Sequence, residues 1–215
     1  MASEKRKSIN RALSVDNLLK ASFREARFEG EWADLLGEPE LAGSWIIWGG
    51  SGCGKTNFAM QLAKQLCAFG KVAYNSIEEG LSKSLKMAVL RQNMKEVGGR
   101  FLILNKEPMN ELIQRLEKRK SHNIIFIDSI QQTQIRLPDY LSLRAQFPRK
   151  LFIWISHEDG RDPDGKLAKE VRYDSDIKIR VEGFRAFASS RFESGPYYTI
   201  YEKGAREYWS LQRNL

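Results

Sequence analysis

One stretch of the chain, SWIIWGGSGCGKT at residues 44–56, constrains its fold more than any other. An apolar run leads into a glycine-rich turn, and from Gly49 onward the spacing fits the pattern G-x-x-x-x-G-K-[ST]. Glycines allow backbone N–H groups to form a concave nest for an anion, and the start of the following helix adds positive charge. The pattern predicts a nucleoside triphosphate site.

The residues of this loop have separate roles in such a site. Lys55 can reach the β- and γ-phosphates, and the Thr56 hydroxyl can bind Mg²⁺. The backbone that would surround the phosphates comes from Gly49, Gly50, Ser51, Gly52, Cys53 and Gly54.

The composition indicates one domain. With 215 residues, 42% of them hydrophobic, the chain can bury a single core, and we expect a basic tail and linker helix over residues 1–27 and a core over residues 28–215. Cys53 and Cys67 have neither disulfide nor metal-ligand spacing, as in reduced cytoplasmic proteins. No run approaches the ~20 apolar residues of a membrane span, so we expect a cytoplasmic protein without membrane contact.

The chain is basic, with 35 Lys and Arg against 27 Asp and Glu, a net charge of +8. Ten of the cations and four of the acids lie in residues 83–120, so this segment holds +6 of the excess. A partner bound to residues 83–120 is one interpretation, and a solvated helix surface is the other.

Apolar strands alternate with amphipathic helices after the loop. Strand patterns cover residues 71–77, 100–104, 123–128 and 150–157, and helix patterns cover residues 57–69, 81–97 and 110–120. This alternation predicts an α/β fold with a mostly parallel sheet and helices on both faces. Helix patterns also cover residues 15–28 and 31–36, and residues 176–182, 185–192 and 197–202 predict an antiparallel C-terminal extension.

Polar side chains follow three of the predicted strands. In open parallel sheets ligands bind at the carboxyl ends of the strands, so these side chains are expected to converge on the phosphates. Asp128 is placed to bind Mg²⁺, and either Glu78 or Glu79 to orient a water for attack on the γ-phosphate. His157 is a candidate donor to the same phosphate or an ordinary loop histidine.

The segments GGSGCGKT, VAYNSIEEG, IIFIDSIQQT and LFIWISHEDG together resemble the core of the RecA superfamily, particularly its RadA/Sms branch. The similarity extends over residues 28–204. It implies a RecA-like P-loop ATPase that binds ATP and Mg²⁺ through Lys55 and Thr56. It also implies that Glu78 is the catalytic base, Asp128 the Walker B acid and His157 a phosphate sensor.

The chain departs from that branch in two places. Where RadA has Lys-Asn-Arg-Phe-Gly, residues 189–193 read SSRFE, so Arg191 alone is left as a charge that could reach a neighbour's nucleotide. The four-cysteine zinc module and the protease-like domain are absent, as in phage and mobile-element ATPases. The resemblance further implies a homo-oligomer, a ring or filament, with ATP sites completed by the neighbouring subunit.

The same resemblance implies DNA-binding loops near residues 131–149 and 158–175. The second loop carries four bases and six acids, which makes a poor phosphate groove. Arg136, Arg144, Arg149 and Lys150, or the basic helices, are therefore favoured for DNA. Residues 23–26 (FREA) fit the F-x-x-A pattern by which related recombinases insert a linker into the next subunit, or form a helix packed on their own core.

The leading hypothesis is a Mg²⁺-dependent ATPase of DNA recombination or replication that couples hydrolysis at subunit interfaces to handling of single-stranded DNA. The alternative is a nucleotide-switched module that assembles and recruits a partner with little DNA binding. A small-molecule kinase is less favoured, because no arginine-rich lid follows Asp128 and a twin-glutamate strand end suits water activation.

Overall fold

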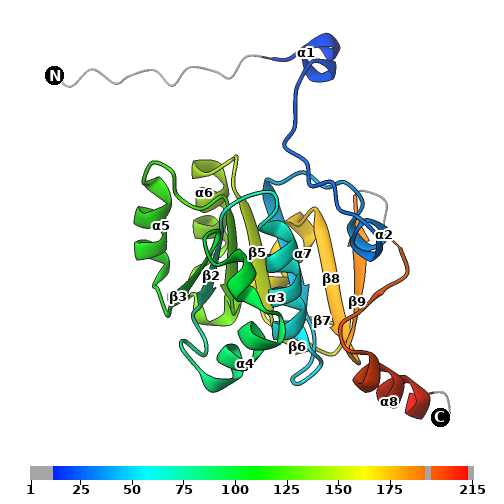
Figure 1. Cartoon of the computed structure of the whole chain (residues 1–215). Coiled ribbons are helices and arrows are strands. Elements are labelled where there is room, and N and C mark those ends of the chain that lie inside the picture. Colours follow the sequence, from blue (N-terminus) through cyan, green and yellow to red (C-terminus); the bar gives the residue numbers. More distant parts are fainter. Residues whose placement is uncertain (1–11, 192–194, 213–215) are drawn as a thin grey trace.

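The computed structural model describes residues 12–191 and 195–212 (Figure 1). Within them, six neighbouring strands of the main sheet are parallel, from β8 to the edge strand β3. The sheet order is β10-β9-β8-β1-β5-β4-β2-β3, and β9 runs antiparallel to both neighbours. The hairpin of β6 (Glu158–Asp159) and β7 (Asp162–Pro163) stands apart. The sheet strands are β1 (Gly43–Trp48), β2 (Val72–Ser76), β3 (Phe101–Asn105), β4 (Ile124–Asp128), β5 (Leu151–Ser156), β8 (Ile177–Glu182), β9 (Arg185–Ser190) and β10 (Tyr198–Thr199).

The central strands are buried on both faces, as their nearly continuous apolar sequences predict. One hydrophobic cluster lies under α2 (Glu31–Leu36), α3 (Lys55–Leu66) and α4 (Lys83–Arg91). The other lies under α5 (Met109–Glu117), α6 (Leu137–Gln146) and α7 (Lys166–Asp174). The expected α/β class, with a mostly parallel sheet and an antiparallel C-terminal extension, is confirmed.

The N-terminal segment differs from the helix expected over residues 15–28. Only α1 (Val15–Leu19) is helical, and it projects from the body without a buried residue (Figure 1). Further on, the N–H of Ala26 donates to Pro39 O and the N–H of Leu41 to Arg24 O. This extended pairing buries Ala26 in the core, so tertiary contacts override the local helix pattern.

Two expected DNA loops and one expected strand contain helices instead. The segment 131–149 includes α6, and the segment 158–175 includes the β6–β7 hairpin and α7. Of the strand-like run 197–202, only β10 pairs with β9, and α8 (Glu202–Gln212) begins at its end. Trp209 of α8 donates from Nε1 to Gly183 O at 3.1 Å, a contact between positions too far apart for a local pattern to reveal.

The basic segment 83–120 does not form one surface. The expected helix over residues 81–97 ends at Arg91 and is followed by the short 3-10 helix η1 (Met94–Val97), after Asn93 at a φ of +47°. α4 buries Leu85 in one hydrophobic cluster, whereas α5 buries Leu112 in the other. The two basic helices therefore lie on opposite faces of the sheet, and the expectation of a single partner surface over residues 83–120 is wrong.

The loop after β1 packs closely against the backbone of strand β8, and a substitution at this contact tests the packing. A Cβ on Gly49 would lie 2.1 Å from the carbonyl oxygen of Val181, a backbone atom. Gly49→Ala is expected to lower stability by roughly 2–3 kcal/mol and the melting temperature by about 5–10 °C. Gly99→Ala, where a Cβ meets no atom within 4 Å, is the control for calorimetry. Equal melting temperatures for the two variants would contradict the packing.

Candidate functional site

The glycine-rich loop joins the end of β1 to the start of α3 and wraps the Lys55 side chain. The Nζ of Lys55 donates to the carbonyl oxygens of Gly49 and Gly50, each at 2.7 Å. Gly54 adopts a φ of +106°, a conformation that L side chains rarely take, and it precedes α3 directly. The loop is thus a nest of backbone N–H groups at a helix N-terminus, the arrangement that binds phosphate.

Asp128 ends β4 at the same level as Ser76 of β2 and Ile155 of β5. Burial raises the pKa of Asp128 to about 6, and the Tyr74 hydroxyl, which donates to Oδ2, opposes that shift. The nearby charges of Glu78 and Glu79 also raise this pKa, whereas Lys55 lowers it. Asp128 therefore lies within electrostatic reach of the lysine of the phosphate loop.

The structure separates the two adjacent glutamates after β2. The N–H of Glu78 donates to Asp128 O at 3.0 Å, and its Oε2 lies 3.0 Å from His157 Nε2. Glu79 instead accepts hydrogen bonds from Ser82, at 2.6 Å, and Ser84, and these hydroxyls lower the pKa of Glu79. Glu78 faces the ends of β4 and β5, and Glu79 turns toward the start of α4.

Thr56 and Asp128 fit the chemistry of a magnesium site. Thr56 is half-buried in the first turn of α3, and Asp128 offers a carboxylate at the end of β4. Hard oxygen donors of this kind bind Mg²⁺ together with phosphate oxygens and water, rather than in an all-protein cage.

Arg191 lies far from the other predicted site residues. Its neighbour Ser190 pairs with Ile177 at the start of β8, and its Nη1 lies 3.3 Å from Asp176 Oδ1. This is the amino end of the parallel strands, opposite the phosphate loop. Any contact of Arg191 with a nucleotide would thus require another subunit; Phe192 and Glu193 of the same motif lie outside the described residues.

Several residues that contact the predicted site residues have no sequence signal. Tyr74 binds Asp128 from within β2, and Gln131 donates to Ser156 Oγ and Asp164 O at 2.8 Å, joining β5 to the β6–β7 hairpin. Beside the loop, Arg180 donates to Glu158 at 2.6 Å. No sequence spacing marks these pairs, because their members lie far apart in the sequence.

A pocket of about 380 Å³ opens beside the phosphate loop and also had no sequence signal. Phe184 packs 3.2 Å from where a Cβ on Gly54 would lie, and its N–H donates to Cys53 O at 3.1 Å. Tyr201 meets Phe184 edge to face, with ring centroids 5.8 Å apart. The lining residues are Asn57, Arg91, Gln92, Phe184, Ile200 and Tyr201.

Comparisons with known proteins agree with this geometry. The family model described as ATPase family associated with various cellular activities (AAA) matches residues 45–137. The flagellar accessory protein FlaH from Methanocaldococcus jannaschii aligns with a TM-score of 0.58 and 18% identity, over 83% of this chain and 92% of that one. The RadB recombinase aligns with a TM-score of 0.52 and 24% identity, over 81% and 94%. Comparison with curated protein sequences gives no match.

The fold is that of the RecA-like P-loop NTPases. The family match and the structural neighbours support an ATP-hydrolysing P-loop NTPase, which implies nucleotide binding and usually Mg²⁺. Within residues 12–191 and 195–212, no helix has the length and apolar character needed to cross a membrane.

The raised pKa of Asp128 gives a pH dependence to the stability of the metal-free protein. Between pH 3.8 and about 6 the folded chain holds a proton that the unfolded chain has released, so the free energy of unfolding falls as pH rises. The loss amounts to at most about 3 kcal/mol. Asp128→Asn is expected to remove it and to be more stable than the parent at pH 7. Urea unfolding from pH 4.5 to 7.5 measures this; parallel pH profiles of the two proteins would contradict the assignment.

Proposed function

We propose that this protein is a Mg²⁺-dependent ATPase that couples hydrolysis to handling of single-stranded DNA in recombination or replication. The observation that carries the ATPase part is the convergence of three strand ends on the phosphate loop. Asp128 ends β4, and Glu78 and His157 lie just after β2 and β5. Glu78 is joined to Asp128 by a backbone hydrogen bond and to His157 through its side chain.

In this proposal each site residue acts on one part of the nucleotide. Backbone N–H groups of residues 49–54 and the Lys55 ammonium hold the phosphates. Thr56 and Asp128 would hold Mg²⁺, which would supply charge neutralisation for the phosphates. Glu78 accepts a proton from the attacking water. His157 orients Glu78 through their 3.0 Å contact and donates to the γ-phosphate when it is bound.

The two glutamates offer a matched test of the base. Glu78→Gln is expected to lower kcat for ATP hydrolysis by about 10²–10⁴-fold while ATP still binds, because the amide cannot accept the proton. Glu79→Gln, which alters the adjacent carboxylate, should change kcat by only a few fold. Phosphate release and nucleotide binding measure the two effects; a larger loss in Glu79→Gln would reverse the assignment.

The pocket at Phe184 and Tyr201 is our candidate site for the adenine base. It adjoins the phosphate loop, and an aromatic ring provides a stacking surface for a base. Phe184→Leu is expected to weaken ATP binding by about tenfold, the scale of one base–aromatic stack. The affinity for inorganic triphosphate, which has no base, is the control. Equal losses for both ligands would place Phe184 outside base recognition.

The exposed N-terminal arm supports assembly into a homo-oligomer. Five apolar side chains of the arm are more than half exposed: Leu13, Val15, Leu18, Leu19 and Phe23. An apolar groove of about 840 Å³ between α4 and β3 offers a surface on a second copy. Ala26 is already buried in its own chain, so the F-x-x-A segment cannot insert as a unit, and Phe23 with α1 is the part available for a neighbour.

Three further features of the protein stay predictions. They are a RadA/Sms-like protein of the phage or mobile-element type, a cytoplasmic location, and a role for Arg191 in a neighbour's ATP site. In each copy Arg191 lies at the end of the sheet away from its own phosphate loop, so this role depends on assembly.

DNA-dependent hydrolysis tests the proposed function as a whole. ATPase activity is expected to rise when single-stranded DNA is added at low salt, and to vanish in Lys55→Ala with or without DNA. Rates are measured by phosphate release. Hydrolysis indifferent to DNA would remove the DNA part of the proposal and leave the ATPase.

Hydrolysis that does not respond to DNA would favour a nucleotide-switched assembly module. One observation supports this alternative function. In the second expected DNA loop, Lys169 is paired with Asp159 and Arg172 with Asp162. ATP-dependent sedimentation as an oligomer without DNA would identify this function.

A further inference from the structure

Basic residues lie in a row at the amino ends of the parallel strands. The proposed ATP site lies at the carboxyl ends of the same strands. Arg100, Lys71 and Lys150 directly precede β3, β2 and β5, and Asn123 precedes β4. The parallel register brings these four positions to one level. Because neighbouring strands are ~4.8 Å apart, the row is roughly 14 Å long.

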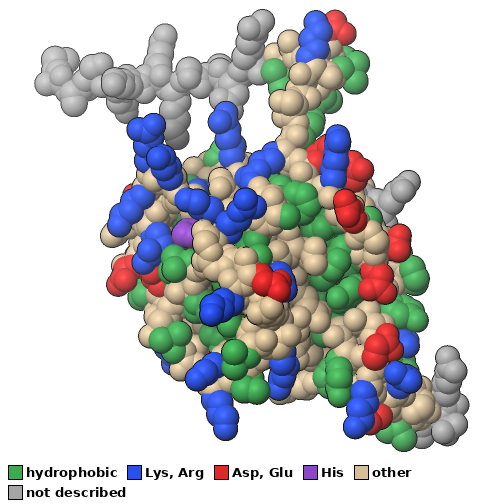
Figure 2. Space-filling view, in the orientation of Figure 1, with side chains coloured by type: hydrophobic (Ala, Val, Ile, Leu, Met, Phe, Trp, Pro, Cys, Tyr) green, Lys and Arg blue, Asp and Glu red, His purple; other side chains and the backbone are tan. Residues whose placement is uncertain are grey.

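The loops that enter β4 and β5 add cations beside this row. We call the whole set the basic edge: Lys71, Arg100, Lys118, Arg119, Lys120, Arg149 and Lys150. All but Lys150 are exposed. Figure 2 shows Lys and Arg side chains gathered at the upper end of the face in view, where they outnumber Asp and Glu.

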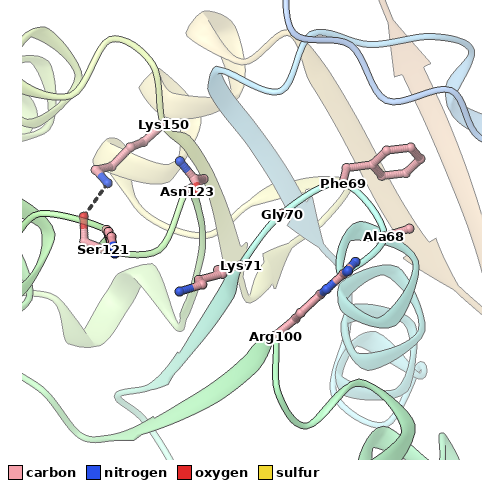
Figure 3. Close-up of a pocket in the computed structure, with 9 residues that line it drawn as sticks. Ala68, Phe69, Gly70, Lys71, Arg100, Ser121, Asn123 and Lys150 are labelled. Atoms are coloured by element: carbon pink, nitrogen blue, oxygen red, sulfur yellow. Dashed lines mark hydrogen bonds between the residues drawn. The ribbon is translucent and has the colours of Figure 1, made fainter.

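A pocket of about 650 Å³ lies within the basic edge (Figure 3). Its cations are Lys71, Arg100, Lys120 and Lys150, and no carboxylate is among the residues that line it. Figure 3 shows Lys71, Arg100 and Lys150 reaching it from three separate strand starts. The other lining residues are Ala68, Phe69, Gly70, Ser121 and Asn123.

Within the described residues, none of the seven side chains of the basic edge forms an ion pair with a carboxylate. Arg100 donates to Cys67 O at 3.1 Å, and Lys150 donates to Ser121 Oγ at 2.8 Å and His122 O at 2.7 Å, all of them uncharged acceptors. By contrast, Lys169 and Arg172 of α7 and Arg180 of β8 have acidic partners. The basic edge therefore gathers positive charge that no carboxylate of the described residues pairs with.

The pKa of His122 responds to these positive charges. Burial lowers the pKa of His122, and the charges of Lys71, Arg115 and Lys150 lower it further. A concentration of like charge costs free energy in the isolated protein and attracts a polyanion. The linear arrangement and the pocket suit successive phosphates of a nucleic-acid strand, each of which a Lys or Arg can neutralise.

We propose that the basic edge binds the phosphate backbone of single-stranded DNA, on the opposite end of the sheet from ATP. This inference rests on the proposed function, since it names the surface that takes the DNA. It places the DNA contacts at strand starts and not in the segment 158–175.

Two variants with equal change in charge test the site. The first carries Lys71→Gln, Lys120→Gln and Arg149→Gln, three exposed residues whose side chains have no hydrogen bond or ion pair within the described chain. The control carries Lys95→Gln, Lys166→Gln and Lys203→Gln, exposed cations of η1, α7 and α8. Fluorescence anisotropy with labelled oligo(dT) from 50 to 300 mM salt gives the affinity, and phosphate release without DNA reports the integrity of the ATP site.

The first variant is expected to bind oligo(dT) at least about tenfold more weakly at 100 mM salt, with the slope of log K against log salt reduced by about 2, since three phosphate contacts are lost. The control should bind like the parent, and basal hydrolysis should be unchanged in both. Equal binding by the first variant and the parent, or a matching loss in the control, would overturn the basic edge and leave DNA-coupled hydrolysis standing. If the parent protein binds no oligo(dT) at 50 mM salt, both the basic edge as a DNA site and DNA-coupled hydrolysis would be overturned. Sedimentation of the protein with phosphatidylserine vesicles would not change that conclusion.

Discussion

The parallel register of the sheet is the constraint on which the rest of the structure depends. Pairing of β2, β4 and β5 in register brings their carboxyl ends to one edge, so Asp128 lies level with Ser76 and Ile155. The residues after these strands then meet beside the phosphate loop, which follows β1 at the same edge. A slip of one residue would turn every side chain of a strand to the opposite face and separate Tyr74 from Asp128.

The same register makes the two ends of the sheet chemically different. At the carboxyl ends, acidic groups and backbone N–H groups surround a place for phosphates and a metal ion. At the amino ends of β2, β3, β4 and β5, the lysines and arginines of the basic edge collect without a carboxylate partner among the described residues. The two proposed binding sites are separated by the length of the strands, so coupling between them would pass through β2, β4 and β5, which are buried along almost their whole length. Gln131, which joins β5 to the β6–β7 hairpin, is one polar link at the ATP end.

The sequence predicted those parts of the site that depend on fixed spacing. A polar residue at the end of a buried strand must lie at the sheet edge, so the sequence predicted that Glu78, Asp128 and His157 lie at one edge, and their roles toward a nucleotide stay predictions. The choice between Glu78 and Glu79 was open, because it depends on Ser82 and Ser84 binding one of the two.

Other features depend on tertiary contacts that no local pattern contains. Residues 24–28 have a helical pattern but pair with the chain before β1, and Phe184 reaches the phosphate loop only because β8 and β9 turn back at Gly183. The basic helices α4 and α5 were expected on one surface, and the topology places them on opposite faces. The basic edge was equally hidden, since its cations are spread from Lys71 to Lys150 and only the sheet brings them together.

A crystal structure with Mg²⁺ and a non-hydrolysable ATP analogue would test the central claim most directly, that the strand ends and the phosphate loop form one ATP site. The account predicts the triphosphate on the N–H groups of residues 49–56, with Mg²⁺ bound by Thr56 and directed toward Asp128. It also predicts that Lys55 Nζ leaves the carbonyl oxygens of Gly49 and Gly50 for the β- and γ-phosphates. A nucleotide bound elsewhere, or a Lys55 that keeps both carbonyl contacts beside the bound triphosphate, would contradict it.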